Sequence, residues 1–236
     1  MITKNGIIKR TLLESYKNIR RSGLIAINLD EGDELLHVLR TDGDSDVLLA
    51  THKGFAVHFE ESAARTLGRT ARGVKAINLS EGDIVVGAVA LSKDDERQIL
   101  FISENGYGKR SNISEFPIHN RGGKGVTCHK ASDKLGMLAG IQAVSDEDDV
   151  MLITNTGMII RTRVNEISVY SRTAAGVRVM RIGDDMKIVS FTRVDKQEEQ
   201  ENAEGEENVL AEGETAESTD APAETSENSE STEVQE

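Results

Sequence analysis

Leu100–Ser111 has the sequence LFISENGYGKRS, in which an Asn-Gly pair at Asn105-Gly106 separates two runs of strand-forming residues. β-Branched and aromatic residues favour strands. Asn-Gly favours the type I′ turn, because both central residues of that turn need a positive φ. The stretch therefore predicts a β-hairpin.

Hairpins of the same kind are predicted at residues 1–10 (MITKNGIIKR), 48–59 (LLATHKGFAVHF) and 151–164 (MLITNTGMIIRTRV). The turn glycines follow one another at steps of 48, 52 and 51 residues: Gly6, Gly54, Gly106 and Gly157. A second set follows at steps of 50, 52 and 51 residues: Gly23, Gly73, Gly125 and Gly176. Two sets with one period of about 50 residues indicate four repeats, numbered 1 to 4 in chain order.

Each repeat has four short β-rich segments, namely the two hairpin strands, a third such as GVKAINL (73–79) and a fourth such as IVVGAVAL (84–91). Four short strands per repeat of about 50 residues are typical of a propeller blade. We expect an all-β, propeller-like disc over residues 1–194. Met1 aligns with Leu49, inside a strand of repeat 2, so we expect that repeat 1 lacks its leading strand and that the chain is a piece of a longer protein.

The net charge of −13 is an average over two different segments. Residues 195–236 contain 16 acidic residues and one lysine, whereas residues 1–194 contain 27 Lys and Arg against 25 Asp and Glu. A segment so acidic and so poor in large apolar residues cannot bury enough surface to fold. We expect a disordered C-terminal tail over 195–236, which serves either to keep the protein in solution or to regulate its binding.

The single cysteine, Cys128, is inconsistent with a disulfide framework and fits a reducing compartment. No apolar run approaches the length of about 18 residues that a membrane span needs. We therefore expect a cytoplasmic protein with no membrane contact.

A basic, glycine-rich loop precedes the third strand of each repeat: IRRSGLI (19–25), GRTARGV (68–74), HNRGGKGV (119–126) and SRTAAGV (171–177). In repeats 2 to 4 an arginine stands four residues before the strand glycine, at Arg69, Arg121 and Arg172. Cations placed once per repeat would lie side by side along the rim of a disc, where they could neutralise the regularly spaced phosphates of duplex DNA. The alternative is that they are ordinary solvated loop cations.

We expect phosphate contacts from these loops and from the cations that follow the hairpin turns. The candidate residues are Lys9, Arg10, Arg20, Arg21, Arg69, Arg72, Lys75, Lys109, Arg110, Arg121, Lys124, Arg161, Arg163, Arg172 and Arg178.

The segments NGYGKR (105–110) and TRVNEIS (162–168), with the recurring GV…I.L.EGD pattern, resemble the C-terminal domain of the DNA gyrase A protein over residues 1–194. The resemblance implies a β-pinwheel, a six-bladed propeller-like disc whose basic edge wraps DNA and directs ATP-dependent negative supercoiling. It implies three partners in a chromosome-associated A2B2 complex: double-stranded DNA, the gyrase B protein and a second gyrase A protein. The two protein partners are expected to bind an N-terminal region that this chain lacks. ATP, Mg²⁺ and the DNA-cleaving tyrosine are expected on other parts of that complex.

Other interpretations stay open. The family's box, roughly Q-R-R-G-G-R-G-x-K-G, is absent, and NRGGKG at Asn120 is a degenerate copy, which leaves the sister domain of the topoisomerase IV A protein as an alternative. A propeller that binds protein partners, of the chromatin-regulator type, is another. A propeller enzyme would need recurring acidic or histidine ligands, which the repeats do not contain. His119 and Cys128-His129 lack paired zinc spacing, and no phosphate-binding G-x-x-x-x-G-K-[ST] motif is present. We expect no catalytic residue, metal or cofactor in this chain.

Overall fold

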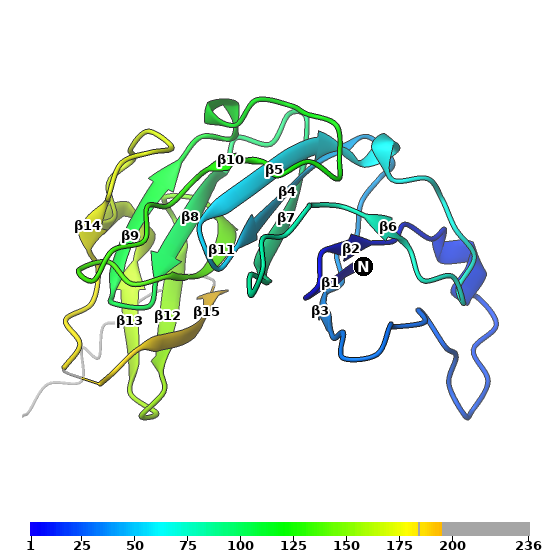
Figure 1. Cartoon of the computed structure of the whole chain (residues 1–236), viewed down its shortest axis with the longest axis horizontal. Helices are drawn as coiled ribbons and strands as arrows, with labels where there is room; N and C mark the ends of the chain where they lie inside the picture. Colours follow the sequence, from blue (N-terminus) through cyan, green and yellow to red (C-terminus); the bar gives the residue numbers. More distant parts are fainter. Residues whose placement is uncertain (184, 195–236) are drawn as a thin grey trace, which may run out of the picture. The chain divides into compact units, whose positions relative to one another are not determined.

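The computed structural model describes residues 1–183 and 185–194. Within these residues the chain forms four antiparallel sheets, joined by loops and by short 3₁₀ helices (Figure 1). The predicted all-β propeller with repeats of about 50 residues is confirmed. The predicted disordered tail, residues 195–236, lies outside the described residues. The described part contains no helix long and apolar enough to cross a membrane.

The strands of each sheet are given in spatial order. Sheet 1 consists of β3 (Leu35–His37), β1 (Ile2–Thr3), β2 (Ile7–Ile8) and β6 (Val74–Lys75). Sheet 2 consists of β10 (Val126–Thr127), β5 (Phe55–Glu60), β4 (Ser45–Thr51) and β7 (Val85–Ser92). Sheet 3 consists of β11 (Leu138–Val144), β8 (Gln98–Ser103), β9 (Tyr107–Ser111) and β14 (Val177–Arg178). Sheet 4 consists of β13 (Ile159–Arg163), β12 (Asp149–Thr154) and β15 (Ile188–Val194).

A 3₁₀ helix follows the second hairpin strand in each repeat. These helices are η1 (Leu13–Tyr16), η2 (Glu61–Ala63), η3 (Ile113–Glu115) and η4 (Val164–Glu166).

The outer strands of sheets 1 to 3 come from the next repeat, which the sequence did not predict. β6, β10 and β14, here called the exchanged strands, follow the second glycine of repeats 2, 3 and 4. Each pairs with the hairpin of the preceding repeat: Val126 lies opposite Ala56, and Val177 lies opposite Gly108. A sheet is therefore built from three strands of one repeat and one strand of the next.

The two sets of glycines meet at these exchanges. A Cβ atom on Gly125 would clash with the carbonyl oxygen of Ala56, and one on Gly54 would clash with the carbonyl oxygen of His129. Both glycines have a positive φ, of 78° and 83°. The Gly54 carbonyl in turn accepts hydrogen bonds from the Cys128 and His129 amides, at 2.8 and 3.1 Å. Each junction uses one turn glycine and one second glycine, because two backbone segments are in contact there. The two sets of glycines therefore recur with the same period.

The recurring EGD motif caps the hairpin turns. The Asp83 Oδ1 accepts hydrogen bonds from the Lys53 and Ile84 amides, at 3.0 and 2.9 Å. The Asp33 Oδ1 accepts a hydrogen bond from the Asn5 amide at 2.9 Å, in the same position of repeat 1. The aspartate therefore connects the fourth strand of a repeat to its own hairpin.

The apolar cores lie between neighbouring sheets, and the central strands bury both faces. In β4, Val47 and Leu49 belong to the cluster shared with sheet 1. Leu48 of the same strand belongs to the cluster shared with sheet 3, which also contains Phe101. Strands covered on both faces are continuously apolar rather than alternating, which explains runs such as VLLA and ILFI.

Candidate nucleic-acid interface

The three arginines that stand four residues before the strand glycine, here called the loop arginines, occupy equivalent positions. Arg121 donates from Nε to the Ala63 carbonyl at 2.8 Å and from Nη1 to the Lys75 carbonyl at 2.9 Å. Ala63 is the last residue of η2 and Lys75 is the last residue of β6, both in the preceding repeat.

Arg172 repeats both contacts, and Arg69 repeats the contact made by Nη1. Arg172 donates to the Glu115 carbonyl at 3.2 Å and to the Thr127 carbonyl, which end η3 and β10. Arg69 donates to the Ile25 carbonyl at 3.2 Å. All three side chains are half-buried and are held by backbone carbonyls rather than by carboxylates. A guanidinium has more N–H donors than two carbonyls occupy, so each can still donate to an anion.

Lys9 and Lys109 are buried, which corrects their prediction as phosphate contacts. They are 1% and 2% exposed. Lys9 Nζ donates to the Ala26 carbonyl at 2.6 Å and to the Arg69 carbonyl, and Lys109 Nζ donates to the Arg172 and Ala174 carbonyls. Burial lowers the pKa of Lys109 to about 8. Both lysines hold the basic loop of the next repeat from inside.

The arginines that follow the hairpin turns are paired with carboxylates. Arg110 is 6% exposed and contacts Asp146 and the Ile167 carbonyl, so it is also removed from the candidate set. Arg10 lies 3.7 Å from Glu61, and Arg161 lies 2.7 Å from Asp149. A carboxylate so close offsets the positive charge that a phosphate would meet.

Two exposed cations lie over aromatic rings of the preceding repeat. Lys124 Nζ is 5.1 Å from the centroid of Phe55, and the Arg178 guanidinium is 5.4 Å from the centroid of Tyr107. Arg178 also donates to the Tyr107 hydroxyl at 2.8 Å. Phe55 and Tyr107 both follow a turn glycine, so the rings are equivalent, whereas Lys124 precedes the strand glycine of its repeat and Arg178 follows it. Such cation–π contacts favour a fixed side-chain position.

Sequence reasoning missed a third cation, which lies over an aromatic ring of its own repeat. Lys134 Nζ lies 5.5 Å from the Tyr107 centroid, and its side chain is exposed. It lies outside the basic loops, so the loop pattern did not include it. An aromatic residue follows the turn glycine in repeats 2 and 3, and this was the available signal.

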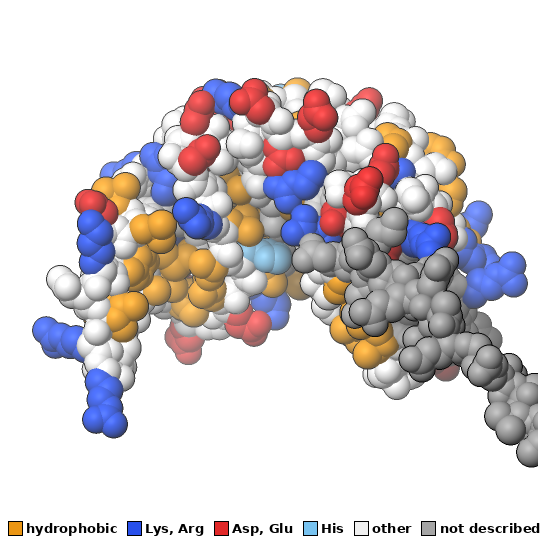
Figure 2. All heavy atoms as spheres, turned by 180° about the vertical axis from the view of Figure 1, so that it is seen from behind, with side chains coloured by type: hydrophobic (Ala, Val, Ile, Leu, Met, Phe, Trp, Pro, Cys, Tyr) orange, Lys and Arg blue, Asp and Glu red, His pale blue; other side chains and the backbone are white. Residues whose placement is uncertain are grey.

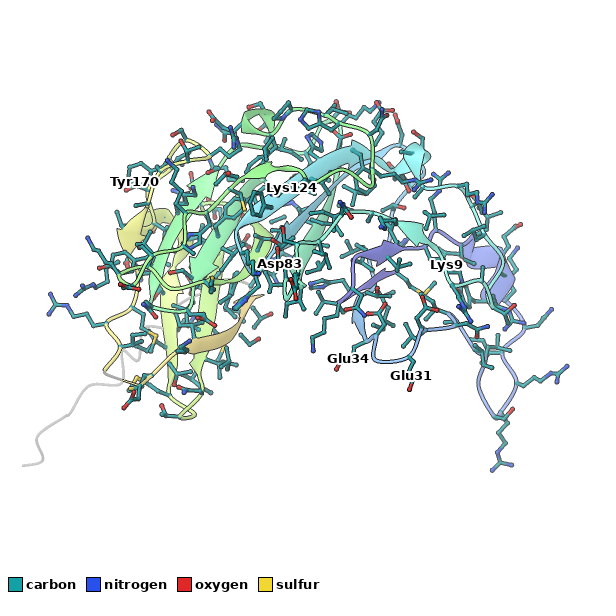
Figure 3. The ribbon with its side chains drawn as sticks, viewed as in Figure 1. Lys9, Glu31, Glu34, Asp83, Lys124 and Tyr170 are labelled. Carbon is teal, nitrogen blue, oxygen red and sulfur yellow. The ribbon has the colours of Figure 1, made fainter. Side chains whose placement is uncertain are left out.

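The remaining candidates lie on the surface. Arg20, Arg21, Arg72, Lys75 and Arg163 are exposed, and of these Arg72 is paired with Asp30 at 2.7 Å. On the face shown in Figure 2, basic and acidic side chains are interspersed. Lys9 and Lys124 are labelled in Figure 3 and illustrate the buried and the surface environments.

The junction between repeats 2 and 3 brings three candidates together. The loop of repeat 3 lies against residues 75–78, because the Gly122 amide donates to the Ala76 carbonyl at 2.6 Å and the Asn78 amide donates to the Gly123 carbonyl at 2.8 Å. Lys75, Arg121 and Lys124, here called the basic junction, therefore lie on neighbouring backbone segments. Arg121 is joined to this segment directly, because its Nη1 donates to the Lys75 carbonyl.

The described residues contain no cluster of three or more His, Cys, Asp or Glu side chains that could hold a metal ion. The one thiol, Cys128, is fully buried, and burial raises its pKa to about 12. A buried thiol with a raised pKa is a poor nucleophile, because the thiolate is the reactive form.

Comparisons with known proteins agree with this architecture. The family model described as "DNA gyrase C-terminal domain, beta-propeller" matches residues 1–42, 45–92, 97–145 and 148–195, one match per repeat. The DNA gyrase A protein of Staphylococcus epidermidis is 43% identical over 197 residues, which cover 84% of this chain and 22% of that protein. The chain therefore spans less than a quarter of the length of this relative.

Two solved structures have a similar fold. The C-terminal domain of DNA topoisomerase IV superposes with a TM-score of 0.77 at 30% identity, covering 82% of this chain and 60% of that one. The DNA gyrase A C-terminal domain superposes with a TM-score of 0.69 at 30% identity, covering 81% and 64%. The two structures are equally similar in sequence, whereas the family model and the curated relative both point to gyrase. The chain belongs to the family of DNA gyrase A C-terminal propeller domains.

Proposed function

We propose that this chain is a DNA-wrapping module that bends duplex DNA along its basic loops, within a gyrase holoenzyme that supercoils DNA at the expense of ATP. The basic junction carries this proposal. There Arg121 is held by two carbonyls and Lys124 lies over Phe55, while Lys75 is exposed. Cations with fixed positions lose little side-chain freedom when they contact phosphate.

The contacts proposed here are with the DNA backbone and not with base edges. Phosphate contacts set the position of the duplex without reading its sequence. Smooth bending of 20–30 base pairs costs about 1–6 kcal/mol, which contacts repeated along the duplex can offset. The revised contact set consists of Arg20, Arg21, Arg69, Lys75, Arg121, Lys124, Arg163, Arg172 and Arg178.

The other parts of the reaction are assigned to the rest of the holoenzyme. We propose that ATP hydrolysis, Mg²⁺ binding and strand cleavage take place on the gyrase B protein and on the N-terminal part of the gyrase A protein. Lys109 and Cys128 are buried, so neither side chain is placed to act on a substrate at the surface.

Salt dependence of DNA binding tests this function. A module that contacts about 6–10 phosphates loses about 10³–10⁵ in affinity between 50 and 200 mM salt, with little dependence on sequence. The variant Lys75→Glu/Lys124→Glu is expected to bind more weakly and with a shallower salt slope. The control Lys17→Glu/Lys93→Glu makes the same charge change at exposed lysines outside the basic loops and is expected to behave as the native chain. Salt-independent or undetectable binding by the native chain would favour a propeller for protein partners.

A further inference from the structure

The basic loops of repeats 2 to 4 are of two kinds. The loops of repeats 2 and 4 contain GRTA (68–71) and SRTA (171–174). In each of them the amide of the fourth residue donates to the carbonyl of the first at 3.1 Å, so the loop arginine is the second residue of a four-residue turn. The loop of repeat 3 contains NRGG (120–123) and is instead hydrogen-bonded to residues 76 and 78. The loop arginines therefore have one place in the sequence and two backbone environments.

The turns of repeats 2 and 4 need a donor from outside the loop. The closing hydrogen bond of such a turn uses the carbonyl of its first residue and leaves that of its second without a partner in the turn. A carbonyl that faces the interior needs a donor from elsewhere. Lys9 Nζ donates to the Arg69 carbonyl, and Lys109 Nζ donates to the Arg172 carbonyl. Each buried lysine therefore binds the backbone of a loop arginine in the next repeat.

The residue at this place matches the kind of loop that follows it. Lys9 and Lys109 precede the two loops with a turn, whereas the equivalent residue before the loop of repeat 3 is Val57, which is 0% exposed. The loop of repeat 3 is held through its Gly122 amide, which donates to the Ala76 carbonyl at 2.6 Å. A lysine at this place is therefore not a requirement of the fold, and it serves the loops with a turn.

Arg172 is held at both its backbone and its guanidinium. Its carbonyl accepts a hydrogen bond from Lys109, and its amide donates to a side-chain oxygen of Glu115 at 3.3 Å. Its guanidinium donates to the Glu115 and Thr127 carbonyls. A guanidinium has five N–H donors, so some stay free for an anion. The direction of these free donors depends on a backbone that Lys109 holds.

Lys109 changes its charge in a range where arginine stays protonated. Burial lowers its pKa to about 8, the Arg172 charge lowers this pKa further, and the Glu115 charge opposes the shift. The groups that face Lys109 from the surrounding elements are Arg172, Glu115, the Cys128 thiol, the His129 ring and the Phe101 ring. The Cys128 thiol has a pKa of about 12 and stays uncharged in this range.

We propose, on the basis of the proposed function, that Lys109 is a positioning residue for DNA binding, because its ammonium holds the backbone of Arg172 while the guanidinium contacts a phosphate. Lys9 has the same role for Arg69. Lys109 is 2% exposed, so it acts through the loop arginine rather than by touching DNA. An uncharged amine donates weaker hydrogen bonds than an ammonium does. Loss of the proton therefore loosens the loop and weakens DNA binding.

The pH dependence of DNA binding tests this role. At a fixed salt concentration and pH 7, the native chain is expected to bind duplex DNA up to about tenfold more tightly than Lys109→Met, and this ratio is expected to fall toward one at pH 9. The free energy of unfolding of the native chain relative to Lys109→Met is expected to rise between pH 8 and pH 9, because the folded chain disfavours the charged lysine. A merely structural role would change both quantities in the same direction.

A double-mutant cycle shows whether Lys109 acts through Arg172. Arg172→Gln is expected to weaken binding and to remove its pH dependence, and adding Lys109→Met is expected to cause no further loss. Lys17→Met removes one exposed lysine outside the basic loops and is expected to keep the pH dependence of the native chain. The pH profile of Arg172→Gln requires no change in the buried site, so it decides the question even if Lys109→Met does not fold.

Two results would overturn this role and leave the proposed function in place. One is salt-dependent DNA binding whose pH profile is the same for the native chain and Arg172→Gln. The other is a loss for the double variant that equals the sum of the two single losses. Native binding that is undetectable or independent of salt would refute the proposed function itself, and the role of Lys109 with it.

Discussion

Gly125→Ala tests the junctions between repeats, and Gly23→Ala is its matched control. Both glycines have nearly the same φ, of 78° and 80°, so alanine meets a similar backbone strain at both. That strain is about 1–2 kcal/mol, and the loss of freedom of the unfolded chain returns about 0.4–1 kcal/mol. The net cost common to the two positions is therefore about 0–1.6 kcal/mol.

The positions differ in what an added Cβ meets. At Gly23 it meets nothing within 4 Å, whereas at Gly125 it clashes with the Ala56 carbonyl. Relief of that clash moves β10 away from β5 and weakens the two hydrogen bonds from the Cys128 and His129 amides to the Gly54 carbonyl. At about 0.5–1.5 kcal/mol for each hydrogen bond, with further loss from β10 pairing, Gly125→Ala is expected to cost about 2–4 kcal/mol more than Gly23→Ala.

Urea unfolding followed by far-ultraviolet circular dichroism measures this difference, since the chain has no tryptophan. A lower midpoint for Gly125→Ala than for Gly23→Ala is the expected result. Equal midpoints would show that the close approach of the two backbones does not stabilise the fold.

Three further predictions concern the buried lysine, the aromatic core and the acidic tail. The pKa of Lys109 is lowered from its ordinary 10.5 to about 8, so between pH 8 and pH 10.5 the unfolded chain binds more protons than the folded chain. The contribution of this group to the free energy of unfolding therefore rises with pH across that window. The difference in urea midpoint between the native chain and Lys109→Met is expected to rise with pH in this window. A difference that does not change with pH would contradict this prediction. Phe101→Ala removes a ring that is 2% exposed and whose centroid lies 5.6 Å from that of Phe116. The substitution is expected to lower the free energy of unfolding by about 3–5 kcal/mol in the same assay. A loss below about 1 kcal/mol, close to what an exposed substitution costs, would refute the core assignment. Removal of residues 195–236 takes away 16 acidic side chains and is expected to tighten DNA binding in a filter or fluorescence titration, so an unchanged affinity would reject a competing tail.

The hairpins and their period could be predicted from sequence because their signals are local. Asn105-Gly106 specifies a turn by the backbone conformation it needs, and β8 and β9 pair across it. The strand exchange could not be predicted, because β14 has two residues and its partner Tyr107 lies 71 residues earlier. Pairing over such a separation leaves no local pattern.

Exposure of the cations was the less predictable part of the site. The loop arginines were correctly grouped, since an equal distance from a glycine gives an equal place in each repeat. The prediction of Lys109 on the surface was wrong. Residue type alone does not distinguish a buried lysine that donates to backbone carbonyls from a lysine in water. Two of its three equivalents, Val57 and Ile160, are apolar, which was the available sign of an inward-facing position; the third is Lys9, which is buried as well.

The proposed function requires that the basic loops bend duplex DNA around this chain. Energy transfer between dyes at the two ends of a linear duplex measures that bend. We expect the ends to approach one another when the native chain binds, and we expect Lys75→Glu/Lys124→Glu to reduce the approach while Lys17→Glu/Lys93→Glu does not. Binding without any approach of the ends, or equal bending by both double variants, would show that the basic loops do not wrap DNA.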